Sequence, residues 1–268
     1  MRKIMRLNRV RVGFLVVALF GLVSIGGASG ATTTTVGQTD AAANYVCGSG
    51  GEYDLTTAVT SGSAYVVPPG DWTVNSWSTF AGSMGGSMSM VVFRPTVDIG
   101  AYTVVATSPV QTLTPSSLNT FPTSVRVKGG DQVGFWATNA ACSTETALPT
   151  DVSPFDVGPL PLVGDMVTPF PVPGFKANIS ASLTKVSPAQ LKLEELLASL
   201  SGQGPGNSFI TKVKEILSNV SGADKAKACS NLAAFNAELK AQVGKKVTLG
   251  QAIVLTALSN AVRSALGC

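Results

Sequence analysis

The stretch 121–137, FPTSVRVKGGDQVGFWA, decides the fold class of the chain. Val125 and Val127 alternate with Arg126 and Lys128, and after a Gly-Gly-Asp turn apolar residues return at every second position. Alternation with a period of two on both sides of a turn is typical of antiparallel strands with one buried face. The stretch therefore predicts a β-hairpin inside a half-buried sheet.

More strands are expected around this hairpin, over 72–80, 87–94 and 102–113, and a closing strand over 176–186. Short strands between regular turn signals are typical of an antiparallel β-sandwich, of jelly-roll or Ig-like type. The proline-rich segment 151–174 precedes the closing strand. We expect it to be a surface loop packed over the sandwich, and a linker is the alternative.

At Ser187 the apolar period changes from two to that of a helix. Ser187, Pro188 and Gln190 form a capping box with proline at the first helical position, and a second box spans 248–251. Apolar residues recur at helical spacing in four segments, and Gly244 ends the third. The sequence thus predicts an α+β multidomain protein, a sandwich followed by a small four-helix module.

Residues 1–31 have the composition of a secretory signal peptide. Five basic residues precede an apolar run that is too short to cross a bilayer, and small residues follow it. We expect cleavage after export, leaving a flexible leader over 32–44, a β-sandwich domain over 45–186 and a helical module over 187–268. Without those five residues, 14 of the 19 Lys and Arg residues remain against 15 Asp and Glu residues. Because the mature chain then has no excess of positive charge, we expect it to bind neither nucleic acid nor a membrane.

Export would place the four cysteines in an oxidising compartment. Four cysteines allow three disulfide pairings. The domain division favours Cys47 with Cys142 and Cys229 with Cys268, since each pair then lies within one domain. Closing these loops should contribute about 4 kcal/mol each and would stabilise the small helical module in particular.

Short motifs carry a resemblance to known families. The helical segment resembles the FIMAH-type helical module found at the C-termini of secreted bacterial proteins, through Gly204-Pro205-Gly206-Asn207-Ser208, Ala228-Cys229, Leu232, Phe235, Gly244-Lys245-Lys246 and Leu266-Gly267-Cys268. The β-region is similar to sandwich domains of uncharacterised secreted actinobacterial proteins, through Trp77-Ser78, Phe93-Arg94-Pro95, Tyr102-Thr103-Val104-Val105 and Asn119-Thr120-Phe121-Pro122-Thr123. The resemblance implies an exported bacterial protein built from accessory modules, and it implies no reaction.

The chain contains no histidine, which narrows the chemistry. Ser-His-Asp and Cys-His nucleophilic sites and the usual His-containing zinc sites are excluded. No phosphate-binding glycine loop occurs, because the glycines near position 85 lack a following Lys-Ser or Lys-Thr. We expect no catalytic residue, no metal and no cofactor.

Two pairs of carboxylates could still support glycoside hydrolysis, Glu52 with Asp54 and Asp151 with Asp156. Each pair lies beside Gly or Pro, so the favoured interpretation is solvated turn residues. The same interpretation applies to Asp98 and Asp131, for which a calcium site is the alternative.

The tryptophans are the candidates for ligand binding, namely Trp72, Trp77 and Trp136. Trp72 and Trp77 have opposite parity on one expected strand, so one should be in the core and the other should face outward. An outward tryptophan could stack on a sugar, whereas placement in the core is the more common role of large aromatic residues. The expected partner is a carbohydrate or a cell-envelope polymer.

Together these features predict a secreted, non-catalytic binding or adhesion protein of the bacterial envelope or extracellular matrix, located outside the cell or at its surface. One alternative is a carboxylate-dependent enzyme acting on polysaccharides, which needs two acids about 5 to 9 Å apart in a groove. Another is a structural surface protein whose Ser/Thr-rich faces and exposed edge strands associate with copies of itself.

Overall fold

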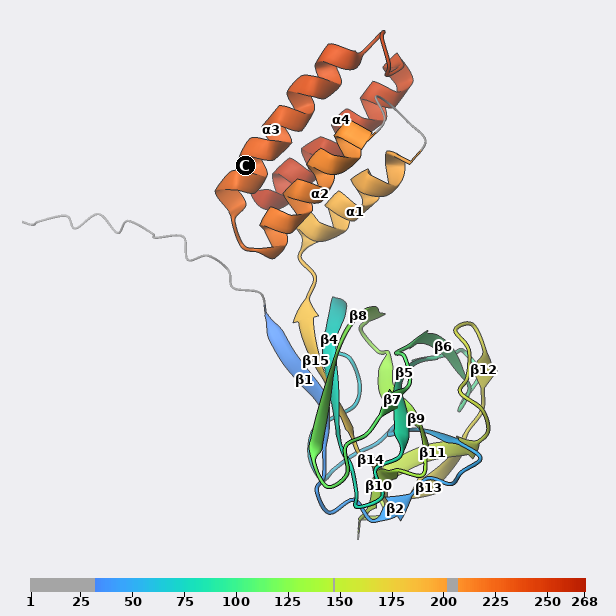
Figure 1. Ribbon diagram of the computed structural model, residues 1–268. Helices are drawn as coiled ribbons and strands as arrows, with labels where there is room; N and C mark the ends of the chain where they lie inside the picture. Colours follow the sequence, from blue (N-terminus) through green and yellow to red (C-terminus); the bar gives the residue numbers. More distant parts are fainter. Residues whose placement is uncertain (1–31, 147, 202–206) are drawn as a thin grey trace, which may run out of the picture.

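The computed structural model describes residues 32–146, 148–201 and 207–268, which form a β-rich part and a bundle of four helices (Figure 1). The predicted fold class is confirmed. The expected signal peptide lies outside the described residues, as do Gly204, Pro205 and Gly206 of the FIMAH-type motif. Among the helices of the described ranges, none is long and apolar enough to cross a membrane.

The strands form three sheets, and every pair of neighbouring strands is antiparallel. The four-stranded sheet has the order β1 (Thr33–Gln38), β15 (Ile179–Lys185), β4 (Asp71–Phe80) and β8 (Leu118–Lys128). The eight-stranded sheet has the order β12 (Met166–Val167), β6 (Tyr102–Thr107), β5 (Ser87–Pro95), β9 (Gln132–Thr138), β3 (Glu52–Leu55), β11 (Val152–Val157) and β13 (Phe170–Pro173), with β7 (Gln111–Thr112) paired to β5. A small sheet contains β14 (Phe175–Ala177), β10 (Ala141–Glu145) and β2 (Tyr45–Val46).

Strand β5 is buried on both of its faces, which explains its almost continuous apolar sequence. Met88, Met90 and Val92 belong to the main core between the four-stranded and eight-stranded sheets. Val91 and Phe93 point to the opposite side and belong to a second core cluster. The eight-stranded sheet is therefore covered on both faces.

The proline-rich segment provides the second cover. Leu160 packs against the second cluster and Val167 belongs to it. The segment 151–174 also contributes strands β11, β12 and β13 to the sheet, with β12 and β13 at its two ends. It is thus a structured cover of the sheet and not a linker.

The predicted hairpin over 121–137 is wrong, although its strands exist. Strand β8 pairs with β4, whereas β9 pairs with β5 and β3, so the turn at Gly129 carries the chain from one sheet to the other. Asp131 is buried at this corner and accepts hydrogen bonds from Arg94 Nε at 2.7 Å and Arg94 Nη2 at 2.9 Å. Val127 and Val133 still enter the same core, but from opposite sheets. The alternation in the sequence therefore predicted which face of each strand is buried, but it did not predict which strand each one pairs with.

The expected flexible leader over 32–44 is also wrong for its first half. Thr33–Gln38 forms β1, which pairs along its length with β15 and buries Val36 in the main core. Threonine is β-branched and fits a pleated strand, although one buried valine among polar residues gives no apolar period. The β-rich part therefore begins at Thr33.

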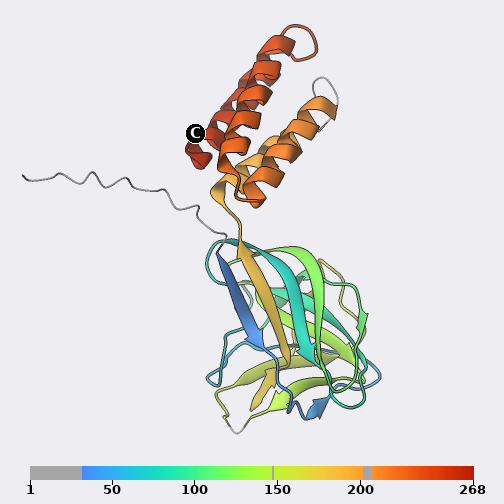
Figure 2. The same ribbon diagram turned by 60° about the vertical axis from the view of Figure 1, so that its left-hand side comes forward.

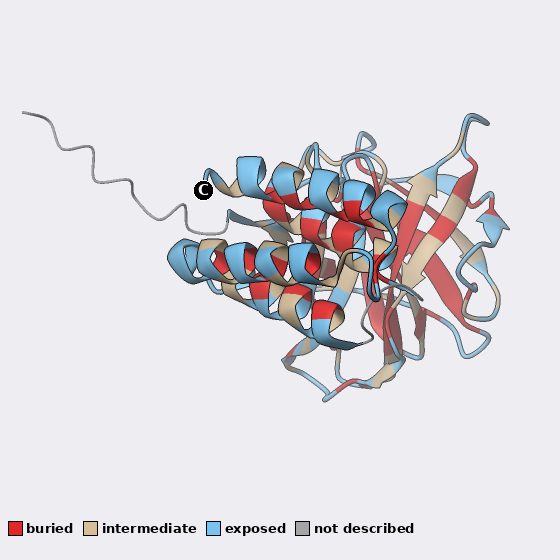
Figure 3. Ribbon diagram, turned by 90° about the horizontal axis from the view of Figure 1, so that it is seen from above, coloured by how far each residue is buried: buried red, intermediate tan, exposed pale blue. Residues whose placement is uncertain are grey.

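The helices are α1 (Pro188–Ser199), α2 (Asn207–Ser221), α3 (Lys225–Gln242) and α4 (Leu249–Leu266). Both predicted capping boxes are formed, at the start of α1 and of α4. The buried residues lie on the inward faces of the helices, as Figure 3 shows from above. In the turned view of Figure 2, β15 leads directly to the helical bundle, with Val186 and Ser187 as the link.

Both predicted disulfides are present. Cys47 is bonded to Cys142 within the β-rich part, and Cys229 of α3 is bonded to Cys268, which follows α4. No cysteine remains free.

Candidate functional site

The tryptophans do not form an exposed stacking surface. Trp72 and Trp77 are 4% and 1% exposed, so the expectation that one of them faces outward is wrong. The reason is a β-bulge: relative to β15, strand β4 has an additional residue at Asn75, which returns Trp77 to the face that carries Trp72. Trp136 is half-buried, and its Nε1 donates to the carbonyl oxygen of Gly158 at 2.9 Å.

The acid pair Glu52 and Asp54 is buried on β3, so its interpretation as solvated turn residues is wrong. Asp54 accepts hydrogen bonds from the Oγ atoms of Ser143 and Ser153. Tyr45 Oη donates to Glu52 Oε2 at 3.2 Å, while Glu52 Oε1 has no partner. Burial raises the pKa of Glu52 to about 7, with a contribution from the charge of Asp54. Burial also raises the pKa of Asp54 to about 6, against the effect of its hydrogen bonds.

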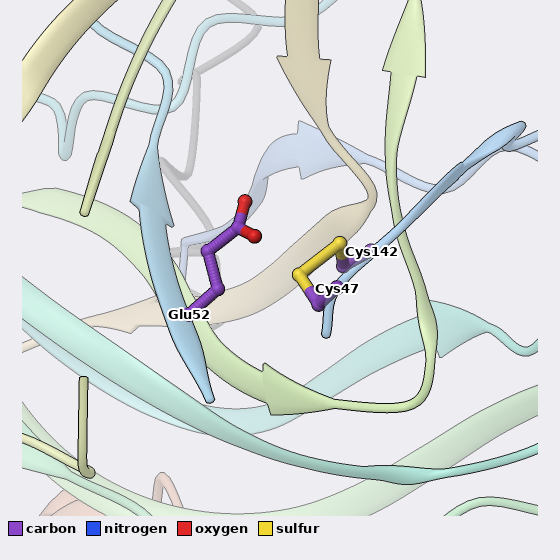
Figure 4. A group of neighbouring side chains, drawn as sticks. All are labelled: Cys47, Glu52 and Cys142. Carbon is purple, nitrogen blue, oxygen red and sulfur yellow. A yellow bond between two sulfur atoms is a disulfide. The ribbon is translucent and has the colours of Figure 1, made fainter. Parts of the chain in front are cut away.

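The space beside these two acids is small. The cavity that they line together with Phe155 and Phe175 measures about 20 Å³, so it can hold about one water molecule and not a sugar. Figure 4 shows the Glu52 carboxyl beside the disulfide of Cys47 and Cys142. Because the two sulfur atoms are bonded to each other, neither is a thiolate that could bind a metal.

Three of the four other acids named from the sequence have structural partners as well. Asp151 is buried, and hydrogen bonds from Ser61 and Thr60 outweigh the effect of burial and lower its pKa to about 2. Asp156 accepts from Tyr53 Oη at 3.1 Å. Asp98 is an exposed turn residue, as expected, whereas Asp131 is buried and forms an ion pair with the partly exposed Arg94.

The surface feature best suited to binding is a groove of about 570 Å³ along the proline-rich segment. Its lining consists of Tyr53 together with residues 156–162 and 165–167, and we call it the apolar groove. A volume of several hundred Å³ with mostly apolar walls is typical of ligand-binding sites. This groove was not predicted from the sequence, although the run VGPLPLVGDM over 157–166 has large apolar residues without any period that would bury them.

Large apolar side chains project from this segment into solvent. Val157, Leu162, Val163 and Met166 are between 63% and 69% exposed, and Phe170 is 73% exposed. Of these, Val157, Leu162 and Met166 line the apolar groove, and large exposed apolar side chains gathered at a groove commonly mark a binding site.

The backbone that carries these side chains is fixed. Gly164 N donates to Val104 O at 2.8 Å, and Val104 N donates to Asp165 O at 2.9 Å, which ties the loop to β6. Leu162 N donates to the Asp165 carboxylate at 2.7 Å within the turn. Leu162 and Val163 are therefore presented by a loop that hydrogen bonds tie to the sheet, which lowers the entropic cost of binding.

A turn near the end of β12 also exposes apolar side chains. Val97 and Ile99 lie in the turn between β5 and β6, and both side chains are fully exposed. The register of β6 with β12 pairs Tyr102 with Val167, which places this turn beside the end of β12. We call Val97 and Ile99 the apolar rim of the groove.

The fold and the groove define a disulfide-bonded antiparallel β protein with a helical module and an exposed groove with apolar side chains. No protein-family model matches the chain, and no curated protein matches it. Two solved structures of the cysteine protease Cwp84 are similar at 12% and 13% sequence identity, with TM-scores of 0.35 and 0.29; the second is described as a surface layer associated protein of Clostridium difficile. They cover 57% and 51% of this chain, which spans 40% and 32% of theirs. A structure of infectious bursal disease virus is similar at 12% identity and a TM-score of 0.25. The match covers 57% of this chain and 33% of the viral chain.

Proposed function

We propose that this is an exported, non-catalytic binding or adhesion protein of the bacterial envelope or the surrounding matrix, and that it binds through the apolar groove. The observation that carries the proposal is the set of large apolar side chains held in solvent by a hydrogen-bonded loop. Exposing them costs solubility, and a binding partner that covers them would account for that cost.

Export is supported by the two disulfides, which persist in oxidising compartments, and by the signal-like composition of residues 1–31. The resemblance of the helical module to FIMAH-type modules of secreted bacterial proteins agrees with this location. The proposal therefore places the protein outside the cytoplasm.

The proposed absence of catalysis is supported by the state of the buried acids, while Asp156 and Asp165 enter the proposal only as charged groups in the lining of the apolar groove. Glu52 and Asp54 face a cavity that is too small for a substrate. Asp151 is buried, and its hydrogen bonds lower its pKa and keep the carboxyl ionised. Glycoside hydrolysis needs a groove that admits a sugar between two carboxyls. Stacking of a sugar on Trp72 or Trp77 likewise finds no support, since both are in the core.

Co-sedimentation with the isolated envelope fraction of the source bacterium tests the proposal. The double variant Leu162→Ser/Met166→Ser should lose most of the binding shown by the unaltered mature protein. The matched control is Ile253→Ser, which removes a similarly exposed apolar side chain, 62% exposed, from α4. Equal retention of the double variant and the unaltered protein would refute the groove as the binding site.

Self-association is the second candidate, favoured by the outer face of the four-stranded sheet. The register aligns Thr35, Ser182 and Ser76 across three strands, in a row of small hydroxyl side chains. The edge strand β8 carries Pro122 and Lys128, which are residues that discourage edge-to-edge pairing. Sedimentation velocity over a hundredfold range of protein concentration distinguishes the two candidates, because a groove-binding protein without its ligand should remain monomeric.

A further inference from the structure

We propose that the ligand of the apolar groove is a basic, apolar polypeptide segment, in which Lys or Arg residues flank large apolar side chains. The inference rests on the proposed function of the groove and adds the chemical class of its partner. It follows from the charges around the groove and from the edges of the sheet beside it.

The charged groups at the groove are all acidic. Asp156 and Asp165 belong to its lining, and Asp98 lies between the two residues of the apolar rim. None of the three forms an ion pair with a cation of the described residues. The side chain of Arg94, on the adjoining strand β5, is already engaged by both oxygens of Asp131.

These carboxylates retain capacity to accept hydrogen bonds. Asp156 accepts one bond at each oxygen, from Val157 N and Tyr53 Oη, and Asp165 accepts one from Leu162 N. An ionised carboxylate can accept about four hydrogen bonds. A Lys or Arg side chain of a ligand could therefore bind each acid without displacing these contacts, in a charge-assisted hydrogen bond.

An added strand is an unsuitable mode of binding at this surface. Strand β13 is an edge of the eight-stranded sheet and carries Pro171 and Pro173, which have no N–H to donate to a partner strand. The opposite edge, β12, has only two residues. Recognition should therefore depend on side chains of the ligand that enter the groove, and not on its backbone.

The surface of a bacterial membrane fits the groove poorly for electrostatic reasons. Anionic lipid head groups attract clusters of Lys and Arg, whereas the groove presents Asp98, Asp156 and Asp165. The same acids attract a basic polypeptide and accelerate its association at low salt.

Fluorescence anisotropy with labelled synthetic peptides tests the inference on the mature, full-length protein. The probes are three twelve-residue peptides with alternating residues, Lys-Leu, Glu-Leu and Lys-Ser. The Lys-Leu peptide should bind at least tenfold more tightly than either of the others, and its affinity should fall as NaCl is raised from 20 to 500 mM. Failure of the Lys-Leu peptide to bind would overturn the inference.

Variants separate the charge from the apolar contact. Asp156→Asn/Asp165→Asn should weaken binding of the Lys-Leu peptide about tenfold and remove most of its salt dependence, while the exposed control Glu145→Gln should leave both unchanged. Thermal unfolding checks that each variant is folded. If the Glu-Leu peptide binds equally well and the aspartate variants have no effect, the basic ligand is refuted while the groove stands as a binding site. If Leu162→Ser/Met166→Ser retains full binding of the Lys-Leu peptide, the peptide binds elsewhere, and both the inference and the proposed function fall.

Discussion

Glu52 is a buried carboxyl with no cation beside it, and this determines how stability depends on pH. The groups that face it are Tyr45 of β2, Asp54 of β3, and the disulfide, while Ser143 and Ser153 face Asp54. Its pKa of about 7 in the folded state lies above the ordinary value of 4.5, so folding favours the protonated form. The stabilisation is complete below the ordinary pKa and is lost as pH rises through the folded value.

We therefore expect the free energy of unfolding to decrease by roughly 2 kcal/mol between pH 5 and pH 8, measured by urea denaturation. Asp54, with a pKa of about 6, acts in the same direction. Asp151 acts in the opposite direction, but its contribution is lost only as pH falls toward 2, outside this window. Glu52→Gln should flatten the dependence. A stability that increases from pH 5 to pH 8, or an unchanged slope in the variant, would contradict this account of the buried pair.

The disulfide beside Glu52 gives a second prediction at this scale. Cys47 and Cys142 are separated by 95 residues, so their bond restricts a long loop in the unfolded chain. Cys47→Ser/Cys142→Ser should lower the free energy of unfolding of the β-rich part by about 4 kcal/mol, measured by chemical denaturation. A loss below about 1 kcal/mol would show that the bond is not a major source of stability.

Single residues also show where the sequence was sufficient and where it was not. The cysteine pairing could be predicted from the domain division, because only one of the three possible pairings keeps both disulfides within single domains. The outward tryptophan did not follow, because the phase of β4 is reset at Asn75 by its pairing with β15, which begins about a hundred residues later. Likewise, a Gly beside Glu52 suggested a turn, but the pairing of β3 with β9 and β11 makes it a buried strand.

At the scale of elements, helix α1 depends on its cap. Ser187 Oγ accepts from Gln190 N at 3.1 Å, and Gln190 Oε1 accepts from Ser187 N at 2.9 Å. Ser187→Ala should destabilise the helical module by about 1 kcal/mol, seen as a lower midpoint of its thermal transition by circular dichroism. Ser230→Ala, in an exposed position of α3, should change it little. Equal effects of the two substitutions would mean that the capping box adds no stability.

Helices and strands could be predicted from the sequence where residues a few positions apart determine where they begin. The helix starts carry capping boxes, and their residues act within one turn of the chain. The pairing of β8 with β4, and not with β9, depends on contacts between distant segments that leave no local mark. The apolar groove was missed for the same reason, since its exposed residues lie in a proline-rich run whose shape is fixed by hydrogen bonds to β6.

At the scale of the molecule, the β-rich part and the helical module have separate cores. The two clusters of the β-rich part contain no residue of the helices, and the cluster of the helical module contains no strand residue. Each part also has its own disulfide. We therefore expect calorimetry to resolve two transitions, with Leu193→Ala lowering the midpoint of only one. A single transition that shifts as a whole would show that the parts unfold cooperatively.

Hydrogen exchange measured by mass spectrometry can locate the binding surface that we propose at the apolar groove. A protein that begins at residue 32 is compared with and without a bacterial envelope fraction. We expect protection from exchange confined to 156–167 and to the turn 96–101, with α4 and the four-stranded sheet unchanged. Protection on the outer face of the four-stranded sheet or along α4, with none at the groove, would contradict it.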